Sequence, residues 1–289
     1  MTRIAVSGPN AEQIEYWNET SGPKWAALGD VIDRQIAPLG RAAMERAALA
    51  AGERVLDVGC GCGHTSLELA GRVGPAGAVL GADISAVMLE QARERARAAG
   101  LPHLRFENVD AQTHDFGPDA FDVAYSRFGV MFFADPRAAF ANLLRGLRPG
   151  GRLSFVCWQE LGRNPWMRIP VAAVAQHVAL PVPASPEAPG PFAFADAERV
   201  QRILVAAGFA DVRAEPLERE LDVAGGADLG ATVDFLLQIG PAGAALREAG
   251  AGVREKVARA VLEAIAPFET PAGVRMPAAA WIFSAARPA

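Results

Sequence analysis

The stretch "VLDVGCGCGHTSLELA", residues 55–70, decides the fold of this chain. An apolar run over 55–58 meets Gly59, Gly61 and Gly63 at alternate positions, and a helical pattern follows at once. Glycine lets a backbone turn tightly and approach a ligand closely. A helix that starts behind such a turn presents free N–H groups and the positive end of its dipole. The stretch therefore predicts a strand, a ligand-binding loop and a helix in succession.

Strand and helix patterns alternate from this stretch to residue 157. The expected strands are 55–58, 78–83, 104–110, 121–126 and 152–157. Such alternation predicts parallel strands joined by right-handed crossovers. We therefore expect an α/β fold with a Rossmann-like, doubly wound sheet, in which ligands bind beyond the carboxyl ends of the strands.

The whole chain divides into four segments by its composition. We expect residues 1–50 to form an N-terminal helical lid and residues 51–158 to form the ligand-binding core. Residues 159–194, rich in proline and aromatics, are expected to form a cap insertion over the site. Residues 195–289 complete the core in this prediction, with a helical insertion and an alanine-rich strand near residue 280.

Composition excludes several classes of protein. The chain has 289 residues, of which 51% are hydrophobic, so it can bury a substantial core. A formal net charge of -5 disfavours a nucleic-acid-binding surface. No stretch approaches the roughly 20 apolar residues that cross a bilayer, and the N-terminus lacks the apolar region of a signal peptide. We expect a cytoplasmic protein without a membrane span, and no pattern indicates its oligomeric state.

The three cysteines point to neither a disulfide framework nor a metal site. An odd number argues against paired cysteines. Cys60 and Cys62 form only a C-x-C pair, and no second pair of ligands lies nearby in the sequence. The expected reading is two small residues in a tight loop.

Acidic residues distinguish the glycine loop from a phosphate-binding loop. The dinucleotide fingerprint is G-x-G-x-x-G, whereas the spacing here is G-x-G-x-G, preceded by Asp57. The Asp57 carboxylate would repel a pyrophosphate and attract an ammonium or sulfonium group. Asp83 ends the second strand, where a carboxylate can accept from both ribose hydroxyls. Asp110 ends the third, where it can accept from the amine of a base. Amino acid, ribose and base are the parts of S-adenosylmethionine.

Five segments together resemble class I S-adenosylmethionine-dependent methyltransferases in their order and spacing. They are "VLDVGCGCG", "GADIS", "NVDAQ", "FDVAYSRFGVMFF" and "LRPGGRL". The resemblance is nearest to the small-molecule type around the quinone-biosynthesis methyltransferases, and it covers roughly residues 50–157 and, more loosely, the last strand. It implies a seven-stranded sheet with an antiparallel last strand. It also implies methyl transfer to a small molecule, which leaves S-adenosylhomocysteine.

The resemblance assigns individual residues to the cofactor. The implied contacts are Asp57 and the backbone of Gly59, Gly61 and Gly63 with the methionine part, Asp83 with the ribose, Ile84 and Met88 with the adenine face, and Asp110 and the Ala111 backbone with the adenine edge.

Catalysis and acceptor binding are predicted from the residues expected near the methyl group. Arg127 follows the fourth strand and is a candidate partner of the cofactor carboxylate, of an acceptor anion or of a structural acid. Tyr16 is the other catalytic candidate. Trp17, Trp25, Trp158 and Trp166 are the acceptor-binding candidates, with ordinary packing as their alternative. An aromatic-lined pocket predicts a small, apolar or aromatic acceptor.

A general base is needed only if the acceptor arrives protonated, and His64 and His114 are the candidates for it. Two other functions stay open at this point. One is a nicotinamide-dependent oxidoreductase, which the loop spacing and Asp57 oppose. The other is a non-catalytic protein that binds S-adenosylmethionine.

Overall fold

The computed structural model describes residues 3–180, 185–247 and 249–289. The strands, in chain order, are β1 (Arg54–Val58), β2 (Ala78–Asp83), β3 (Leu104–Asn108), β4 (Phe121–Arg127), β5 (Leu147–Trp158), β6 (Ala210–Asp222), β7 (Glu269–Thr270) and β8 (Gly273–Ala286). The α-helices are α1 (Ala11–Glu15), α2 (Gly22–Ala27), α3 (Gly29–Ala47), α4 (His64–Val73), α5 (Ala86–Ala98), α6 (Pro136–Gly146), α7 (Pro165–Ala175), α8 (Ala197–Ala206), α9 (Leu229–Leu236), α10 (Gly240–Ala245) and α11 (Ala251–Ile265). A π-helical turn, η1 (Tyr16–Thr20), joins α1 to α2.

The strands form one sheet in the order β3-β2-β1-β4-β5-β8-β6. Strands β1 to β5 pair in parallel, and β8 runs antiparallel to both β5 and β6. The predicted doubly wound sheet with an antiparallel last strand is confirmed. The two-residue strand β7 pairs with β8 off this path and adds an eighth strand to the seven that were expected. The order reverses between β1 and β4, which is where such sheets bind ligands.

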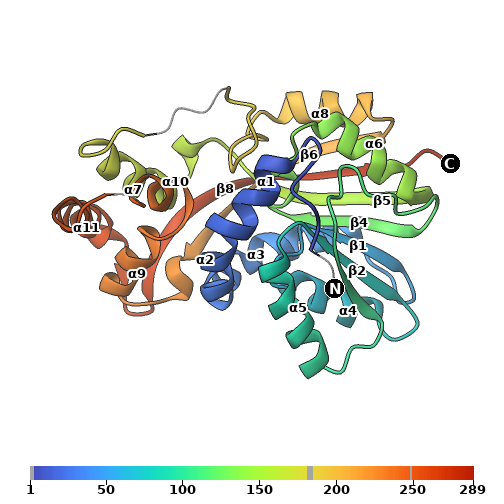
Figure 1. Ribbon diagram of the computed structural model, residues 1–289, viewed down its shortest axis with the longest axis horizontal. Coiled ribbons are helices and arrows are strands. Elements are labelled where there is room, and N and C mark those ends of the chain that lie inside the picture. Colours follow the sequence, from blue (N-terminus) through green and yellow to red (C-terminus); the bar gives the residue numbers. More distant parts are fainter. Residues whose placement is uncertain (1–2, 181–184, 248) are drawn as a thin grey trace.

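Helices cover both faces of the sheet (Figure 1). Helices α3, α4 and α5 lie on one face, and α6 and α8 lie on the other. Because both faces are covered, β1 reads as a continuous apolar run, and Val55, Leu56 and Val58 are all buried. Local capping fixes the helix starts. The Ser85 hydroxyl accepts from the Met88 N–H at α5, and Asp135 accepts from the Ala138 N–H at α6.

A second group of helices lies at one end of the sheet. Helices α7, α9, α10 and α11 gather there around the extended end of β8 (Figure 1). They come from two separate parts of the chain, so α7 of the expected cap insertion packs on helices of the C-terminal segment. Residues 181–184 of that insertion lie outside the described residues.

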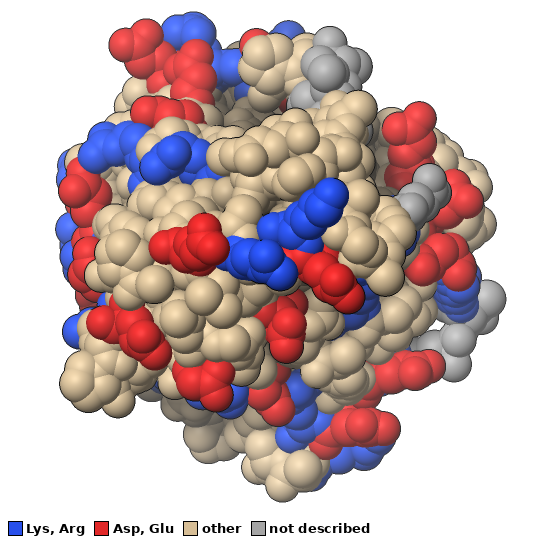
Figure 2. Space-filling view, turned by 90° about the vertical axis from the view of Figure 1, so that its left-hand side faces the viewer, with Lys and Arg blue, Asp and Glu red and all other residues tan. Residues whose placement is uncertain are grey.

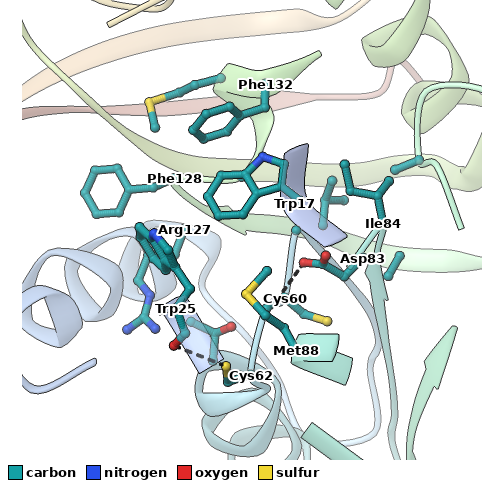
Figure 3. Close-up of a pocket in the computed structure, with 18 of the residues that line it drawn as sticks. Trp17, Trp25, Cys60, Cys62, Asp83, Ile84, Met88, Arg127, Phe128 and Phe132 are labelled. Atoms are coloured by element: carbon teal, nitrogen blue, oxygen red, sulfur yellow. Dashed lines mark hydrogen bonds between the residues drawn. The ribbon is translucent and has the colours of Figure 1, made fainter. Parts of the chain in front are cut away.

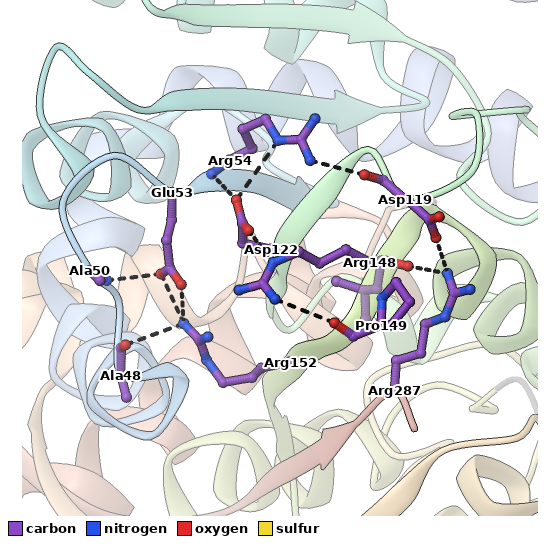
Figure 4. A network of polar contacts seen from close by, with 11 residues as sticks. Ala48, Ala50, Glu53, Arg54, Asp119, Asp122, Arg148, Pro149, Arg152 and Arg287 are labelled. Carbon is purple, nitrogen blue, oxygen red and sulfur yellow. Dashed lines mark hydrogen bonds and ion pairs between the residues drawn. The ribbon is translucent and has the colours of Figure 1, made fainter. Parts of the chain in front are cut away.

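Ion pairs tie together the ends of the strands away from the glycine loop (Figure 4). Arg152 contacts both carboxylate oxygens of Glu53 at 2.8 Å. Asp122 accepts from the Arg54 backbone N–H at 2.7 Å and from the Arg148 side chain. These contacts link the starts of β1 and β4 with β5, and so they fix the scaffold while leaving the carboxyl ends of the strands free.

The surface carries charges of both signs. On the face drawn in Figure 2, Lys and Arg alternate with Asp and Glu, and neither sign forms one continuous area among the atoms described. None of the helices in the described ranges combines the length and the apolar character that a membrane crossing requires.

Candidate functional site

The three glycines of the loop all adopt left-handed backbone conformations, for different reasons. Their φ angles are +69° at Gly59, +54° at Gly61 and +84° at Gly63. A Cβ at Gly59 would lie 2.7 Å from the Cα of Gly129, and one at Gly63 would lie 2.8 Å from the Cβ of Ala92. At Gly61 the nearest atom would be the Met88 sulfur at 3.8 Å. Two glycines therefore allow close packing, and Gly61 leaves the loop bare toward the cavity.

Asp57 lies beneath this loop. Its side chain is fully buried, and one carboxylate oxygen accepts from the hydroxyls of Thr65 and Ser66, both at 2.6 Å. The other oxygen has no hydrogen-bond partner among the described residues. Burial raises the pKa of this carboxyl group, against the opposing effect of the two hydroxyls. Asp57 thus joins β1 to the first turn of α4, and its predicted contact with a ligand stays a prediction.

Asp83 lies at the point where the loop, α5 and the cavity meet. Its two carboxylate oxygens accept from the backbone N–H groups of Gly61 at 2.8 Å and Ser85 at 2.7 Å. Burial raises its pKa from 3.8 to about 6, although these hydrogen bonds oppose the rise. Ile84 and Met88 line the same cavity. An ionised carboxylate has about four acceptor positions, so Asp83 keeps capacity for a ligand.

Asp110 is held by a residue that the sequence analysis missed. One oxygen of Asp110 accepts from the Asn10 side-chain amide at 2.8 Å and from the Gln112 N–H at 2.9 Å. The Asn10 carbonyl in turn accepts from the Ala134 N–H at 2.8 Å. Asp110, Ala111 and Asn10 all line the cavity. The N-terminal segment therefore reaches the predicted adenine end of the site.

Aromatic residues form two groups around the cavity. Trp17 makes edge-to-face contacts with Trp25 and Phe132, with ring centroids 5.5 Å and 5.0 Å apart. Phe128 stacks on Trp158, with centroids 4.1 Å apart and an interplanar angle of 12°. All five rings line the cavity, and Phe128 and Phe132 were not anticipated.

Two predicted aromatics lie outside this lining. Trp166 packs on Trp158 at 5.3 Å, behind the cavity wall. Tyr16 contacts Trp17 and lines a smaller neighbouring cavity with Trp25 and Lys24. Their predicted roles in acceptor binding and catalysis stay predictions.

Arg127 and Asp33 form an ion pair in the cavity wall. The Arg127 Nη1 lies 2.8 Å from the Asp33 Oδ1, and the two side chains are 13% and 23% exposed. Asp33 lies on α3, where Ile32 and Ile36 also line the cavity. None of these α3 residues was predicted to line the site, although their helical spacing places them on one face of the helix.

The two histidines considered as a general base both lie next to acidic side chains. His64 lines the cavity, and its Nε2 lies 2.8 Å from Asp30, which also accepts from Arg95. His114 lies outside the lining residues, near Glu107 and Phe116. Within the described residues, no group of three His, Cys, Asp or Glu side chains could hold a metal ion. Burial raises the pKa of the Cys62 thiol to about 11, and it also raises the pKa of the Cys60 thiol well above its usual value.

These features enclose one main cavity of about 170 Å³ at the carboxyl ends of the parallel strands. Figure 3 shows Asp83, Ile84 and Met88 on one side of it and Arg127, Trp25 and Phe128 on the other, with Trp17 between them. The cavity therefore has a polar half beside the glycine loop and a mainly aromatic half that contains one ion pair.

Comparisons with known proteins agree with this geometry. Residues 55–151 match the family described as "Methyltransferase domain". Aklanonic acid methyltransferase DauC of Streptomyces sp. (strain C5) is 37% identical over 118 residues, which cover 41% of this chain and 54% of that protein. Methyltransferase GfsG of Streptomyces halstedii is 38% identical over 141 residues, 48% of each chain. The chain spans about half the length of the curated relatives it matches.

A solved structure extends the likeness beyond the matched domain. The crystal structure of the [4+2]-cyclase SpnF has a TM-score of 0.52 and 26% sequence identity, covering 87% of this chain and 80% of that one. Residues 55–151 therefore match a methyltransferase domain in sequence, and a larger part of the chain shares its fold with SpnF.

Proposed function

We propose that this chain is an S-adenosylmethionine-dependent methyltransferase that acts on a small, apolar or aromatic molecule. The observation that carries the proposal is the meeting of Gly61, Asp83 and Asp110 in the wall of one cavity. They come from the ends of three neighbouring parallel strands in a domain that matches methyltransferases. The relatives whose printed names are methyltransferases support the same reaction class.

The residues that line the polar half of the cavity fit the parts of the proposed cofactor. Gly61 presents bare backbone to the cavity, and Asp83 offers a carboxylate with unused acceptor positions for the ribose hydroxyls. Ile84 and Met88 supply apolar surface for the adenine, and Asp110 supplies an acceptor for its amine. In its ionised form, the buried Asp57 carboxyl group would place negative charge beneath the loop, which favours a cationic ligand group there.

When bound, S-adenosylmethionine supplies a methyl carbon made electrophilic by its sulfonium group. The residues of this chain contribute position and environment. Trp25, Phe128 and Trp158 exclude water and orient the acceptor, and orientation alone can be worth roughly 7–11 kcal/mol. Arg127 can hold an oxygen anion in the aromatic half. An ionised acceptor needs no general base, so Tyr16, His64 and His114 transfer no proton in this reaction.

The finer assignments belong to the same proposal. Residues 1–50 act as a lid, 51–158 as the cofactor-binding core, 159–194 as a cap and 195–289 as the completed core. Pro191 of the proposed cap lines the cavity, which supports this division. The enzyme works in the cytoplasm on a small molecule and not on nucleic acid.

Transfer of a labelled methyl group tests the proposal. The protein is incubated with S-adenosylmethionine carrying a radioactive methyl group and with a panel of phenols, aromatic acids, amines and thiols. Time-dependent label in an acceptor supports the proposal. Tight binding of S-adenosylmethionine with no transfer to any acceptor would favour a non-catalytic binder or a different reaction. Binding without methyl transfer is worth testing because the similar protein SpnF is named as a cyclase and not as a methyltransferase.

A further inference from the structure

We propose that Arg127, paired with Asp33, binds an anionic oxygen of the acceptor. The acceptor is then a planar aromatic molecule that carries a carboxylate or an ionised hydroxyl group. This inference rests on the proposed function and deepens it by naming the chemistry that the aromatic half of the cavity selects.

Arg127 has donors to spare in the cavity wall. A guanidinium group carries five N–H donors in a planar fork, a geometry that suits carboxylates. Within residues 3–180, 185–247 and 249–289, Asp33 is the one carboxylate at ion-pair distance from the Arg127 guanidinium, and the charge of Arg127 also acts on the buried Asp57 carboxyl group. The Arg127 side chain is only 13% exposed, so a ligand anion would meet it largely shielded from water. Such charge-assisted bonds are stronger than neutral ones.

The surface beside Arg127 is flat and aromatic. Phe128, the next residue, has a φ of +60°, a conformation that is costly for a bulky side chain. Its ring stacks on Trp158 with an interplanar angle of 12°. Figure 3 shows Phe128 and Trp25 close to Arg127 on the same side of the cavity. A cation at the edge of an aromatic wall fits a planar ring that carries an oxygen anion.

The carboxylate of the cofactor is the other anion that could reach Arg127. The aromatic rings beside Arg127 favour the acceptor, and Asp83, Ile84 and Met88, the proposed ribose and adenine contacts, lie on the opposite side of the cavity (Figure 3). Asp33 also restrains Arg127 from α3 and not from the glycine loop. Asp33 is a positioning residue here, and its negative charge also weakens the attraction between Arg127 and a second anion.

A pair of matched probes tests the assignment. 2-Naphthoate and 2-naphthamide have the same rings and differ in charge. Each is titrated into the protein saturated with S-adenosylhomocysteine, and binding is followed by tryptophan fluorescence. We expect the wild type to bind naphthoate at least about tenfold more tightly than naphthamide. Arg127→Met should abolish this difference, and Arg127→Lys should keep part of it. Arg202→Met, exposed on α8, is the matched control and should change neither affinity.

Asp33→Asn should change the naphthoate affinity in the direction opposite to Arg127→Met. Removing the competing carboxylate should raise naphthoate affinity by about 3- to 10-fold and leave naphthamide affinity unchanged. Circular dichroism on heating checks that each variant is folded. If Arg127→Met does not fold, the comparison is made with Arg127→Lys instead.

Two results would overturn the inference while the proposed function stands. One is equal affinity of the wild type for both probes while S-adenosylhomocysteine binds. The other is an unchanged probe ratio in Arg127→Met together with a tenfold loss of S-adenosylhomocysteine affinity, which would assign Arg127 to the cofactor carboxylate. Failure of the wild type to bind S-adenosylhomocysteine would instead overturn the proposed function, and this inference with it.

Discussion

The Asp83 side chain holds two parts of the fold together and also lines the cavity. Its carboxylate accepts from the N–H groups of Gly61 and Ser85, so it fixes the glycine loop and the start of α5. The same carboxylate lines the cavity. The sequence predicted its place at the end of β2, because apolar runs mark strand ends clearly. It could not predict the raised pKa, which results from burial by distant parts of the chain.

This pKa predicts a pH dependence of cofactor binding. Ribose hydroxyls donate to the ionised carboxylate, and Asp83 has a pKa of about 6 in the ligand-free protein. We expect the affinity for S-adenosylhomocysteine, measured by isothermal titration, to fall about tenfold for each pH unit below that value. The affinity should be nearly constant above about pH 7. Asp83→Asn should bind weakly at every pH. A wild-type affinity that does not change between about pH 5 and 7 would contradict the assignment.

The raised pKa of Asp83 also makes the free energy of unfolding depend on pH. The pKa of Asp83 is higher in the folded chain than its ordinary value of 3.8, so the native state binds more protons between these values. The contribution of Asp83 to the free energy of unfolding therefore falls as the pH rises from about 4 to about 6 and stays constant above that range. Asp57, whose pKa is also raised by burial, contributes in the same direction. Urea unfolding of the wild type and Asp83→Asn across this range measures the effect.

The glycines predict a separation between stability and binding. Gly63→Ala should lower the free energy of unfolding by about 2–4 kcal/mol, because its left-handed backbone and the contact with Ala92 both resist a methyl group. Gly61→Ala should cost only about 1–2 kcal/mol, since its Cβ meets nothing closer than 3.8 Å. Gly61 lines the cavity and Gly63 does not, so Gly61→Ala should weaken S-adenosylhomocysteine binding more than tenfold.

Gly100→Ala is the control for this pair. Gly100 follows the end of α5 with a φ of +64° and nothing within 4 Å of the added Cβ, so it isolates the cost of the backbone conformation. Urea unfolding and isothermal titration give the two quantities. Wild-type affinity in Gly61→Ala would remove the loop from the cofactor site.

At the scale of elements, the N-terminal segment is tied to the core by two asparagines. Asn18 donates to the Ile84 carbonyl at 2.9 Å and accepts from the Ala86 N–H at 3.0 Å. Asn10 connects Asp110 with the Ala134 N–H in the same way. The segment α1–η1–α2 is thereby held against the ends of β2 and β3, where the adenine is proposed to bind.

Asn18→Ala tests whether this segment acts as a lid. The change removes three hydrogen bonds, one buried and two partly buried, each worth about 1 kcal/mol. We expect faster proteolytic cleavage before residue 29 and at least about threefold weaker S-adenosylhomocysteine binding, because fewer contacts hold the segment closed. Gln176→Ala, at an exposed position at the end of α7, should alter neither. Faster cleavage with unchanged binding would show that the segment is attached but is not a lid.

The same elements show what sequence reasoning can reach. Helices α5 and α6 were predictable because their starts carry the capping residues Ser85 and Asp135, and α4 was predictable from its helical spacing after the glycine loop. The contact between Asn10 and Asp110 joins residues that lie 100 positions apart, and no local pattern marks it. The pairing of Asp33 with Arg127 is equally non-local. The polar half of the cavity, proposed for the cofactor, follows from strand ends, whereas the aromatic half, proposed for the acceptor, depends on tertiary packing.

At the scale of the whole molecule, the cavity is built from most of the chain. The parallel strands supply its floor, α3 and the N-terminal segment supply one wall, and Trp158 at the end of β5 and Pro191 supply another. The ion pairs at the opposite ends of the strands hold this scaffold (Figure 4). A ligand that contacts all these parts should stabilise the fold by mass action, by about 2.7 kcal/mol at a hundredfold excess over its dissociation constant.

The cavity is proposed to bind S-adenosylmethionine and not a nicotinamide dinucleotide. Isothermal titration of the wild type with S-adenosylhomocysteine and, separately, with NADH tests it most directly. We predict one S-adenosylhomocysteine bound per chain with a dissociation constant on the order of micromolar, typical of small-molecule sites, and no measurable heat with NADH. Micromolar binding of NADH with no binding of S-adenosylhomocysteine would contradict the account.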